Sequence, residues 1–566
     1  MRVEGGSSGR ARASDFGSPR SRSRGRRLPK ASRAAFPAAI LAAIFAAILA
    51  AALPAGASAQ TGPFEADPGF AELGAVADPL PREDLVRAAF LASGTALDLL
   101  PGYAARLEAL LAGLESRLGG IEGHAERGAA LLEALHDGTL VKYEENATTL
   151  DGLLDTGRYN CVSSAMLYMI AGERLGLAIG GVRTFDHAFC SLSVPASGNK
   201  AARSIDIETT NRYGFEPGAR KEFTDSFGRV TGYNYVPPGK YSKRFPVDAR
   251  GMAGLILSNR AAAYERSKRF DEALRMAVDR MAMRADADSV AFFADCVGNL
   301  AAELSAKRDF EGAEALARAA ASIANTAYAT PQPRLTSLVR TTSYNSAVGL
   351  SQAGKREEAF EAAAALAAAY PNDPSFATLA ERALSALGEA AAKAKDFEGA
   401  RKAIEERSGR AGPTRSSALK ATRAALKLVD ELELADAVAS PLFEAAAEKA
   451  AAIGGAGRVD QTVFGRAIAA IYGAEASRIA KEGDWLAAAA VADRGKAVAA
   501  GDGTLARLAK TMRRNFSAEA HNRFAAFYNA GQYELARASI EESLKALPDD
   551  ATMLADLALA KKAQSR

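Results

Sequence analysis

DTGRYNCVSSAMLYMIAGERLGL, residues 155–177, predicts a helix whose first residue is a cysteine. Apolar residues recur at helical spacing after Cys161, and Asn160 is a residue type that favours the N-cap position. A thiol in the first turn of a helix lies at the positive end of the helix dipole, which favours the thiolate. Cys161 is therefore a candidate nucleophile, although a single helical cysteine is more commonly a small apolar packing residue.

A thiolate that attacks a carbonyl needs a group to share its proton, and the chain contains four histidines. His187 has the most informative setting, because DHAFCSLSV, residues 186–194, alternates with the period of a strand. The alternation places His187 on the more polar face and Cys190 on the opposite, core-facing side. We therefore do not expect these two residues to bind one metal.

A catalytic histidine also needs a group that holds its ring in the correct tautomer. In SIDIET, residues 204–209, alternation buries the isoleucines and turns Asp206 to the other face, and a short turn-rich connection predicts a hairpin with the His187 strand. The sequence thus predicts Cys161 as nucleophile, His187 as general base and acid, and Asp206 as the orienting carboxylate. The alternative for Asp206 is to cap the turn that follows it.

The order of a cysteine at a helix start, a histidine on the next strand and an aspartate on the strand after that resembles the transglutaminase-like proteins of the papain superfamily. The resemblance covers roughly residues 135–215 and is carried by NC-x-S-x(3)-LY, GERLGL, DHAF and IDIET. It implies a papain-like α+β domain that acts on amide bonds as a protease, amidase or acyl-transferase, without a cofactor or metal. The chain departs from the family pattern in having Asn160 where Gly is common and Phe189 where Trp is frequent.

The same resemblance implies an oxyanion donor from a side chain upstream of the cysteine, acting with the backbone N–H of Cys161. Tyr143, Asn146 and Tyr159 are the candidates, and we rank Asn146 first. Asn146 also opens NATTLDGLL, so capping the following helix is an alternative role.

After residue 250 the strand patterns end and helical hairpins recur. The turns resemble one another, each followed by an acidic residue and an alanine, as in YERSKRFDEAL and AKAKDFEGAR, and the shared alanines are Ala273, Ala313, Ala359, Ala400, Ala488 and Ala536. The wide gap before Ala488 predicts one degenerate unit between residues 416 and 450. These units resemble tetratricopeptide repeats, which implies an all-α helical solenoid that binds a protein or peptide partner.

The first part of the chain reads as a targeting segment. A basic, Ser- and Arg-rich stretch leads into twenty uncharged, Ala-rich residues, 34–53, and a small-residue cleavage site follows at Ala57-Ser58-Ala59. We expect a cleaved signal peptide at residues 1–59, with an uncleaved membrane anchor as the alternative. Residues 60–83 are predicted to be a linker, 84–250 the cysteine domain with a helical lead-in, and 251–566 the repeats.

Charge and cysteine count exclude two other classes of protein, nucleic-acid-binding proteins and disulfide-stapled scaffolds. The formal charge is +4, but the stretch through Arg33 carries ten basic and two acidic residues, which leaves the remainder at −4. Nucleic-acid binding therefore has no electrostatic basis. An odd count of three cysteines excludes a disulfide-stapled scaffold, and Cys296 in a repeat helix is expected to be a core residue.

Two functions from different classes follow. The first is an exported cell-envelope or periplasmic protein with a Cys-His-Asp domain that acts on amide bonds, while the repeats bind a partner. The second keeps the fold without the chemistry, as an inactive envelope scaffold or adaptor. The sequence does not identify the substrate, the partner, the oligomeric state, or whether water or an amine completes a reaction.

Overall fold

The computed structural model describes most of the chain after the predicted targeting segment. The described residues are 63–196, 201–217, 221–231, 244–328, 331–501 and 503–565. The predicted signal peptide, residues 1–59, lies outside them. None of the described helices is both long enough and apolar enough to cross a bilayer.

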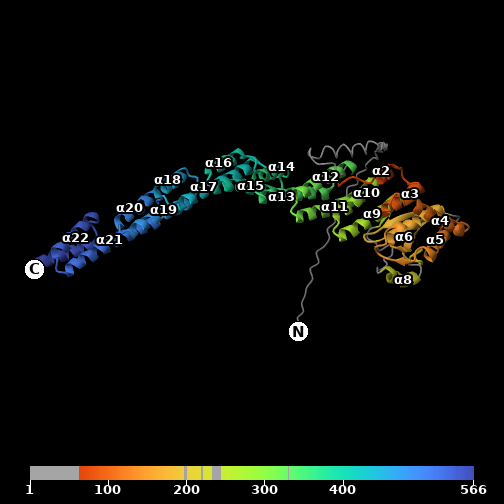
Figure 1. The fold of residues 1–566 in the computed structure, drawn as a ribbon, viewed down its shortest axis with the longest axis horizontal. Coiled ribbons are helices and arrows are strands. Elements are labelled where there is room, and N and C mark those ends of the chain that lie inside the picture. Colours follow the sequence, from red (N-terminus) through yellow and green to blue (C-terminus); the bar gives the residue numbers. More distant parts are fainter. Residues whose placement is uncertain are drawn as a thin grey trace, which may run out of the picture. The chain divides into compact units, whose positions relative to one another are not determined.

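Helices dominate the described residues, with 22 helices and six short strands (Figure 1). In the first part, helices and strands follow in the order α2 (Pro68–Ala75), α3 (Arg82–Ser93), α4 (Leu100–Leu118), α5 (His124–Gly138), β1 (Lys142–Tyr143), α6 (Leu150–Thr156), β2 (Arg158–Tyr159), α7 (Cys161–Arg174), β3 (Ala178–Arg183), β4 (Ala188–Val194), β5 (Arg203–Ile207), α8 (Lys221–Thr231) and β6 (Phe245–Val247). The predicted helix at Cys161 and the predicted strands at 179–194 and 203–207 are confirmed.

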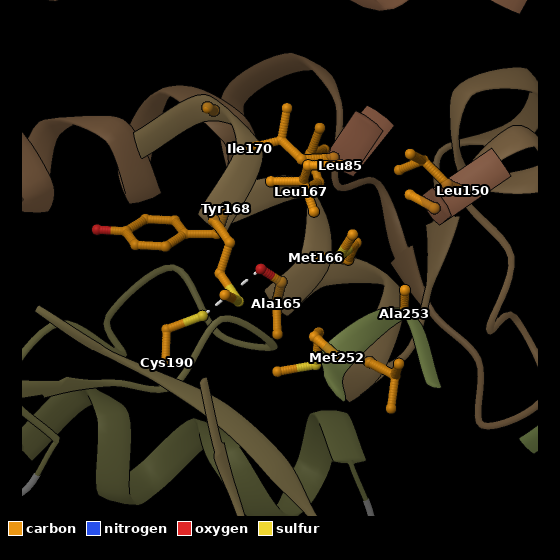
Figure 2. Close-up of a cluster of buried hydrophobic side chains, with 14 of the residues drawn as sticks. Leu85, Leu150, Ala165, Met166, Leu167, Tyr168, Ile170, Cys190, Met252 and Ala253 are labelled. Atoms are coloured by element: carbon orange, nitrogen blue, oxygen red, sulfur yellow. Dashed lines mark hydrogen bonds between the residues drawn. The ribbon is translucent and has the colours of Figure 1, made fainter. Parts of the chain in front are cut away.

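Helix α7 is the centre of this first part. Its residues from Val162 to Gly172 are all buried, because helices pack on one side of it and the sheet on the other. Figure 2 shows the contact with the sheet, where the Cys190 thiol donates to the Ala165 carbonyl at 3.5 Å. A helix that is apolar on every face must lie inside the protein, and α7 does.

The main sheet has the strand order β5-β4-β3-β6, with every neighbouring pair antiparallel. Along β4 the side chains of Ala188, Cys190 and Leu192 are buried, as alternation predicts, but Val194 at the end of the strand is half-buried and Phe189 on the other face is buried as well. A separate parallel pair joins β1 to β2, with Tyr143 opposite Tyr159. This pair brings the segment before α6 alongside the residues that lead into α7.

After β6 the chain forms helical hairpins in sequence order, each packed on the next. Their helices are α9 (Ala249–Arg266), α10 (Phe270–Met283), α11 (Ala287–Ala306), α12 (Phe310–Tyr328), α13 (Pro333–Gln352), α14 (Arg356–Ala369), α15 (Pro374–Lys393), α16 (Phe397–Glu406), α17 (Arg415–Ala439), α18 (Phe443–Gly455), α19 (Gln461–Lys481), α20 (Trp485–Val498), α21 (Gly503–Asn529), α22 (Tyr533–Ala546) and α23 (Ala551–Gln564). The degenerate unit predicted between 416 and 450 is the hairpin of α17 and α18.

All six repeat alanines are buried in the second helix of a hairpin, with at most 1% of their surface exposed. The turn before each of these helices has a residue with positive φ two positions before the helix begins: Lys268, Arg308, Gly354, Lys395, Gly483 and Gly531. A left-handed residue ends the first helix and reverses the chain. Three of the six turns therefore use a charged residue where glycine is the least strained choice.

The predicted boundary at residue 250 does not separate two cores. Helix α9 contributes Met252, Ala253 and Ile256 to the cluster that surrounds α7, and Figure 2 shows the first two beside that helix. The buried Arg250 guanidinium donates to the carbonyls of Leu73 and Met283, which joins α2 and α10 to the start of α9. The first hairpin thus completes the core of the part that precedes it.

The prediction that residues 60–83 are a plain linker is wrong for its described part. Helix α2 packs on α10, and the side chains of Phe64, Phe70 and Leu73 are buried. The Asp279 carboxylate accepts the Asp67 backbone N–H at 2.8 Å. The few apolar residues of this segment are spaced too irregularly to mark a helix in the sequence, yet they are buried against the repeats.

Candidate active site

The sequence NCVSS builds the start of α7. The Asn160 side chain accepts the backbone N–H groups of Val162 and Ser163, and the Ser163 hydroxyl accepts the Asn160 N–H in return. This reciprocal capping box confirms the predicted N-cap and fixes where the helix begins. The half-buried Cys161 is consequently the first helical residue, with its N–H in the group of amides at the positive end of the helix dipole.

His187 lies at the end of the short connection between β3 and β4. The Thr184 N–H donates to the His187 carbonyl at 2.8 Å, which closes this connection just before β4 begins. The imidazole ring stacks beside Phe189 and meets the ring of Phe227 from α8 edge-on, at centroid distances of 6.3 and 6.1 Å. About 10% of the side chain remains exposed, so the ring is enclosed without being sealed from solvent.

The carboxylate that holds His187 belongs to Glu208. Its Oε2 lies 2.6 Å from the imidazole Nε2, and its Oε1 accepts the backbone N–H and the hydroxyl of Thr210, at 3.2 and 2.7 Å. Only 4% of the Glu208 side chain is exposed. A buried carboxylate with both oxygens occupied in this way has one available orientation, and it imposes that orientation on the imidazole.

The prediction that Asp206 orients His187 is wrong, and the strand register gives the reason. Asp206 pairs with Ser191, four residues along β4 from His187, which is about 13 Å in an extended strand. Continuing the register by two pairs, past Ile207 opposite Cys190, brings Glu208 opposite Phe189 and close to the histidine. Asp206 instead forms a two-fold ion pair with the Arg244 guanidinium, at 2.7 and 2.8 Å. The predicted face is right and the predicted position along it is wrong.

The electrostatics of His187 favour its charged form. Burial lowers the pKa of the imidazole, but the Glu208 carboxylate and the hydrogen bond with the Cys161 side chain outweigh it, and the pKa lies well above its ordinary value. Because Glu208 takes Nε2, we infer that Nδ1 is the ring nitrogen that faces the sulfur. Cys161 and His187, which the sequence predicts to act together, thus have side chains close enough to interact electrostatically.

A second set of hydrogen bonds joins α7 to the residues after β5. The Ser164 hydroxyl lies 2.8 Å from the Thr209 hydroxyl and also donates to the Asn160 carbonyl at 2.7 Å. Glu208, Thr209 and Thr210 are all buried polar residues. The Ser164–Thr209 contact and the Tyr159 hydroxyl, which donates to the Thr210 carbonyl, therefore tie the start of α7 to the segment that carries Glu208.

Asn146 does not cap α6, and its role as an oxyanion donor stays a prediction. Its side-chain oxygen accepts from the Arg266 guanidinium at 2.9 Å, and Thr149 is the N-cap residue of α6. Of the other two oxyanion candidates, Tyr159 is buried and donates its hydroxyl to the Thr210 carbonyl at 3.2 Å. Tyr143 packs against the Tyr159 ring. The backbone N–H of Cys161, at the start of α7, stays the main-chain donor that the resemblance implies.

The other two cysteines are core residues, as predicted. Cys190 and Cys296 are buried, and burial raises the pKa of both thiols. All three cysteines are free thiols. Within the described part of the chain, no group of three or more His, Cys, Asp and Glu side chains could hold a metal ion.

Two residues of the site were not identified from the sequence. Glu208 is two residues from Asp206 and faces the same side of the sheet. Alternation therefore allows either residue to orient His187, and only the strand register decides between them. His136 is half-buried, with its Nε2 3.1 Å from the Thr209 carbonyl, and its ring lies edge-on to Tyr159. No local pattern marked His136, because its neighbours come from distant parts of the chain.

The chain matches no protein-family model. No curated protein matches it either.

Proposed function

We propose that this protein is a cysteine-dependent amide hydrolase or acyl-transferase of the transglutaminase-like, papain-like type, exported to the cell envelope. The observation that carries the proposal is the arrangement of His187 between a buried carboxylate at 2.6 Å and the side chain of Cys161. This is the geometry that nucleophilic triads require: a nucleophile, a base within reach of it, and a third group that orients the base. Glu208 fills the third role.

In the proposed reaction the Cys161 sulfur attacks an amide carbonyl carbon and forms a C–S bond. The developing oxyanion accepts a hydrogen bond from the Cys161 N–H. The His187 imidazolium then donates its proton to the leaving nitrogen as the C–N bond breaks, which releases the amine and leaves an acyl-thioester. Water or a second amine attacks the thioester and gives its proton to His187, which restores the thiol and frees the acyl product.

The helical hairpins are proposed to hold a protein or peptide partner. They are the larger part of the chain, from α9 to α23, and successive hairpins of this kind present long continuous surfaces to partners. Export is proposed from the targeting segment described in the sequence. Together these features suit an enzyme that is brought to its substrate by a partner.

The adaptor without chemistry is favoured by one observation. Helix α8 places Phe227 against the imidazole ring, and Phe223 packs on Phe227. A histidine enclosed by aromatic side chains can be a structural residue that the carboxylate satisfies.

Thiol reactivity tests the proposal. At pH 6, iodoacetamide should carbamidomethylate Cys161 at least about tenfold faster than it does a free model thiol such as glutathione, because a cysteine at a helix start beside a cationic side chain is a stronger nucleophile. The buried Cys190 and Cys296 are internal controls, and peptide mass spectrometry of each site reads the rates separately. A Cys161 rate no higher than that of glutathione, and unchanged in His187→Ala, would reject the enzyme and leave the adaptor.

A further inference from the structure

A cavity of about 520 Å³ adjoins the candidate active site. Tyr159, two residues before Cys161, lines it, as does Thr210, which holds the Glu208 carboxylate. Ser226 lines it from α8, beside the Phe227 that contacts His187. The cavity therefore adjoins the segments that carry the triad through these three residues, while residues 136–143 form its other wall. Its volume is typical of sites for small ligands or for a few residues of a peptide.

The charged side chains that line this cavity are basic. Lys142 and Arg212 contribute to the wall, and within the described residues no Asp or Glu does. His136, which also lines it, adds no charge at neutral pH because burial lowers the pKa of its imidazole to about 4. Tyrosine, serine, threonine and asparagine side chains make up the polar remainder.

The carboxylates outside the cavity do not cancel its positive charge. Glu144 is shared between Lys142 and Arg158, at 2.8 and 2.7 Å, and Asp137 is shared between Arg212 and Arg117, at 2.8 and 2.9 Å. Four cations thus meet two carboxylates. The Glu208 carboxylate behind the wall is itself opposed by the imidazolium of His187. An anionic group that entered the cavity would meet an excess of hydrogen-bond donors with positive charge.

We propose that this cavity is a substrate subsite for a carboxylate-bearing residue, and that the protein acts on amide bonds in acidic peptides. The inference rests on the proposed function of the Cys161 site and names its substrate class. Lys142 and Arg212 bind the carboxylate, while the tyrosine rings of the wall contact the aliphatic part of the residue that carries it. Because the subsite lies beside the nucleophile, the acidic residue is placed within one or two residues of the amide that reacts.

Binding to a chain without the nucleophile tests this subsite separately from catalysis. The full-length Cys161→Ala protein is titrated calorimetrically with two acetylated and amidated pentapeptides, Glu-Glu-Ala-Glu-Glu and Gln-Gln-Ala-Gln-Gln. The acidic peptide should bind at least about tenfold more tightly, since two charge-assisted contacts are each worth more than a neutral hydrogen bond. Its affinity should also fall as salt is raised from 50 to 300 mM.

Substitutions in the same background locate the effect. Arg212→Gln and Lys142→Gln should each remove most of the preference, and Arg212→Lys should retain part of it. Each substitution leaves the partner carboxylate with its second cation, so the fold is expected to persist, as thermal melting checks. Arg158→Gln is the matched control, because Arg158 pairs with Glu144 but does not line the cavity.

Equal affinities for the two peptides, or a preference that survives in both Gln variants, would overturn the subsite. Neither result depends on a reactive thiol, so the subsite can fail while the alkylation experiment succeeds. Slow alkylation together with a charge preference that requires Arg212 would instead reject the enzyme and keep an acidic-peptide site.

Discussion

The helical hairpins and the candidate active site differ in the sequence separation of the residues whose contacts determine their structure. A hairpin is settled by residues close in sequence: a left-handed turn residue, and then an alanine that lets two consecutive helices approach. The site is settled by Asn160, His187 and Glu208, which come from a helix start and two strand ends. Local patterns therefore predict the first region well, whereas the second depends on a strand register that no local pattern contains.

The largest expected effect distinguishes two carboxylates, Asp206 in β5 and Glu208 just after it. Glu208→Gln should lower kcat/KM for amide cleavage by roughly 10²- to 10⁴-fold, because the imidazole loses the anion that orients and charges it. Asp206→Asn should lower it by less than about threefold, since Asp206 pairs with Arg244 away from the histidine. Steady-state rates of the two purified variants measure this. Equal losses would return Asp206 to the triad.

The pH dependence sharpens the same comparison. The pKa of His187 is raised in the folded protein, so the stabilising pair with Glu208 is fully present below the unfolded value of about 6.5. It is lost as the pH rises through the higher folded value. The alkaline limb of kcat/KM should therefore lie above pH 6.5, and Glu208→Gln should move it to lower pH. Asp206→Asn should leave that limb in place.

In the repeats, the next effect tests close helix approach. Ala359→Leu should destabilise the protein by about 1–3 kcal/mol, because the buried alanine of α14 leaves no space for three further carbon atoms. Ala365→Leu on the exposed face of the same helix is the control and should change the stability by less than about 0.5 kcal/mol. Thermal melting followed by circular dichroism compares them. Similar losses for both would show that helix propensity, rather than packing, sets the cost.

The smallest expected effect concerns the turns. Lys395 has a φ of 63°, so Lys395→Gly should stabilise its hairpin by up to about 1 kcal/mol. Gly483 occupies the equivalent place before α20 with a φ of 90°, and Gly483→Ala should cost a similar amount. Melting curves of the two variants should shift in opposite directions. A shift of the same sign would show that these positions are not equivalent.

Particular residues show where prediction from sequence succeeded and where it stopped. The helix start at Cys161, the inward face of Cys190 and the six repeat alanines were predictable, because caps and periodicity depend on neighbouring residues. The choice of Glu208 over Asp206 was not, since both side chains share a strand face and a register shift of two residues, which keeps that face, exchanges them. His136 and helix α2 were missed because distant segments bury them, as with Asp279 and the Asp67 N–H.

The shared position of α9 decides how the protein can be dissected. A fragment that stopped at residue 250 would lose Met252 and Ile256 and so expose the apolar side of the helix that begins with Cys161. Conversely, a repeat fragment that began there would lack the partners that Arg250 binds. A cut after α10 would still separate Phe64 from Phe293 and Arg183 from Asp288, because both partners lie in α11. Through α9, a disturbance of the first hairpin reaches the helix that begins with Cys161.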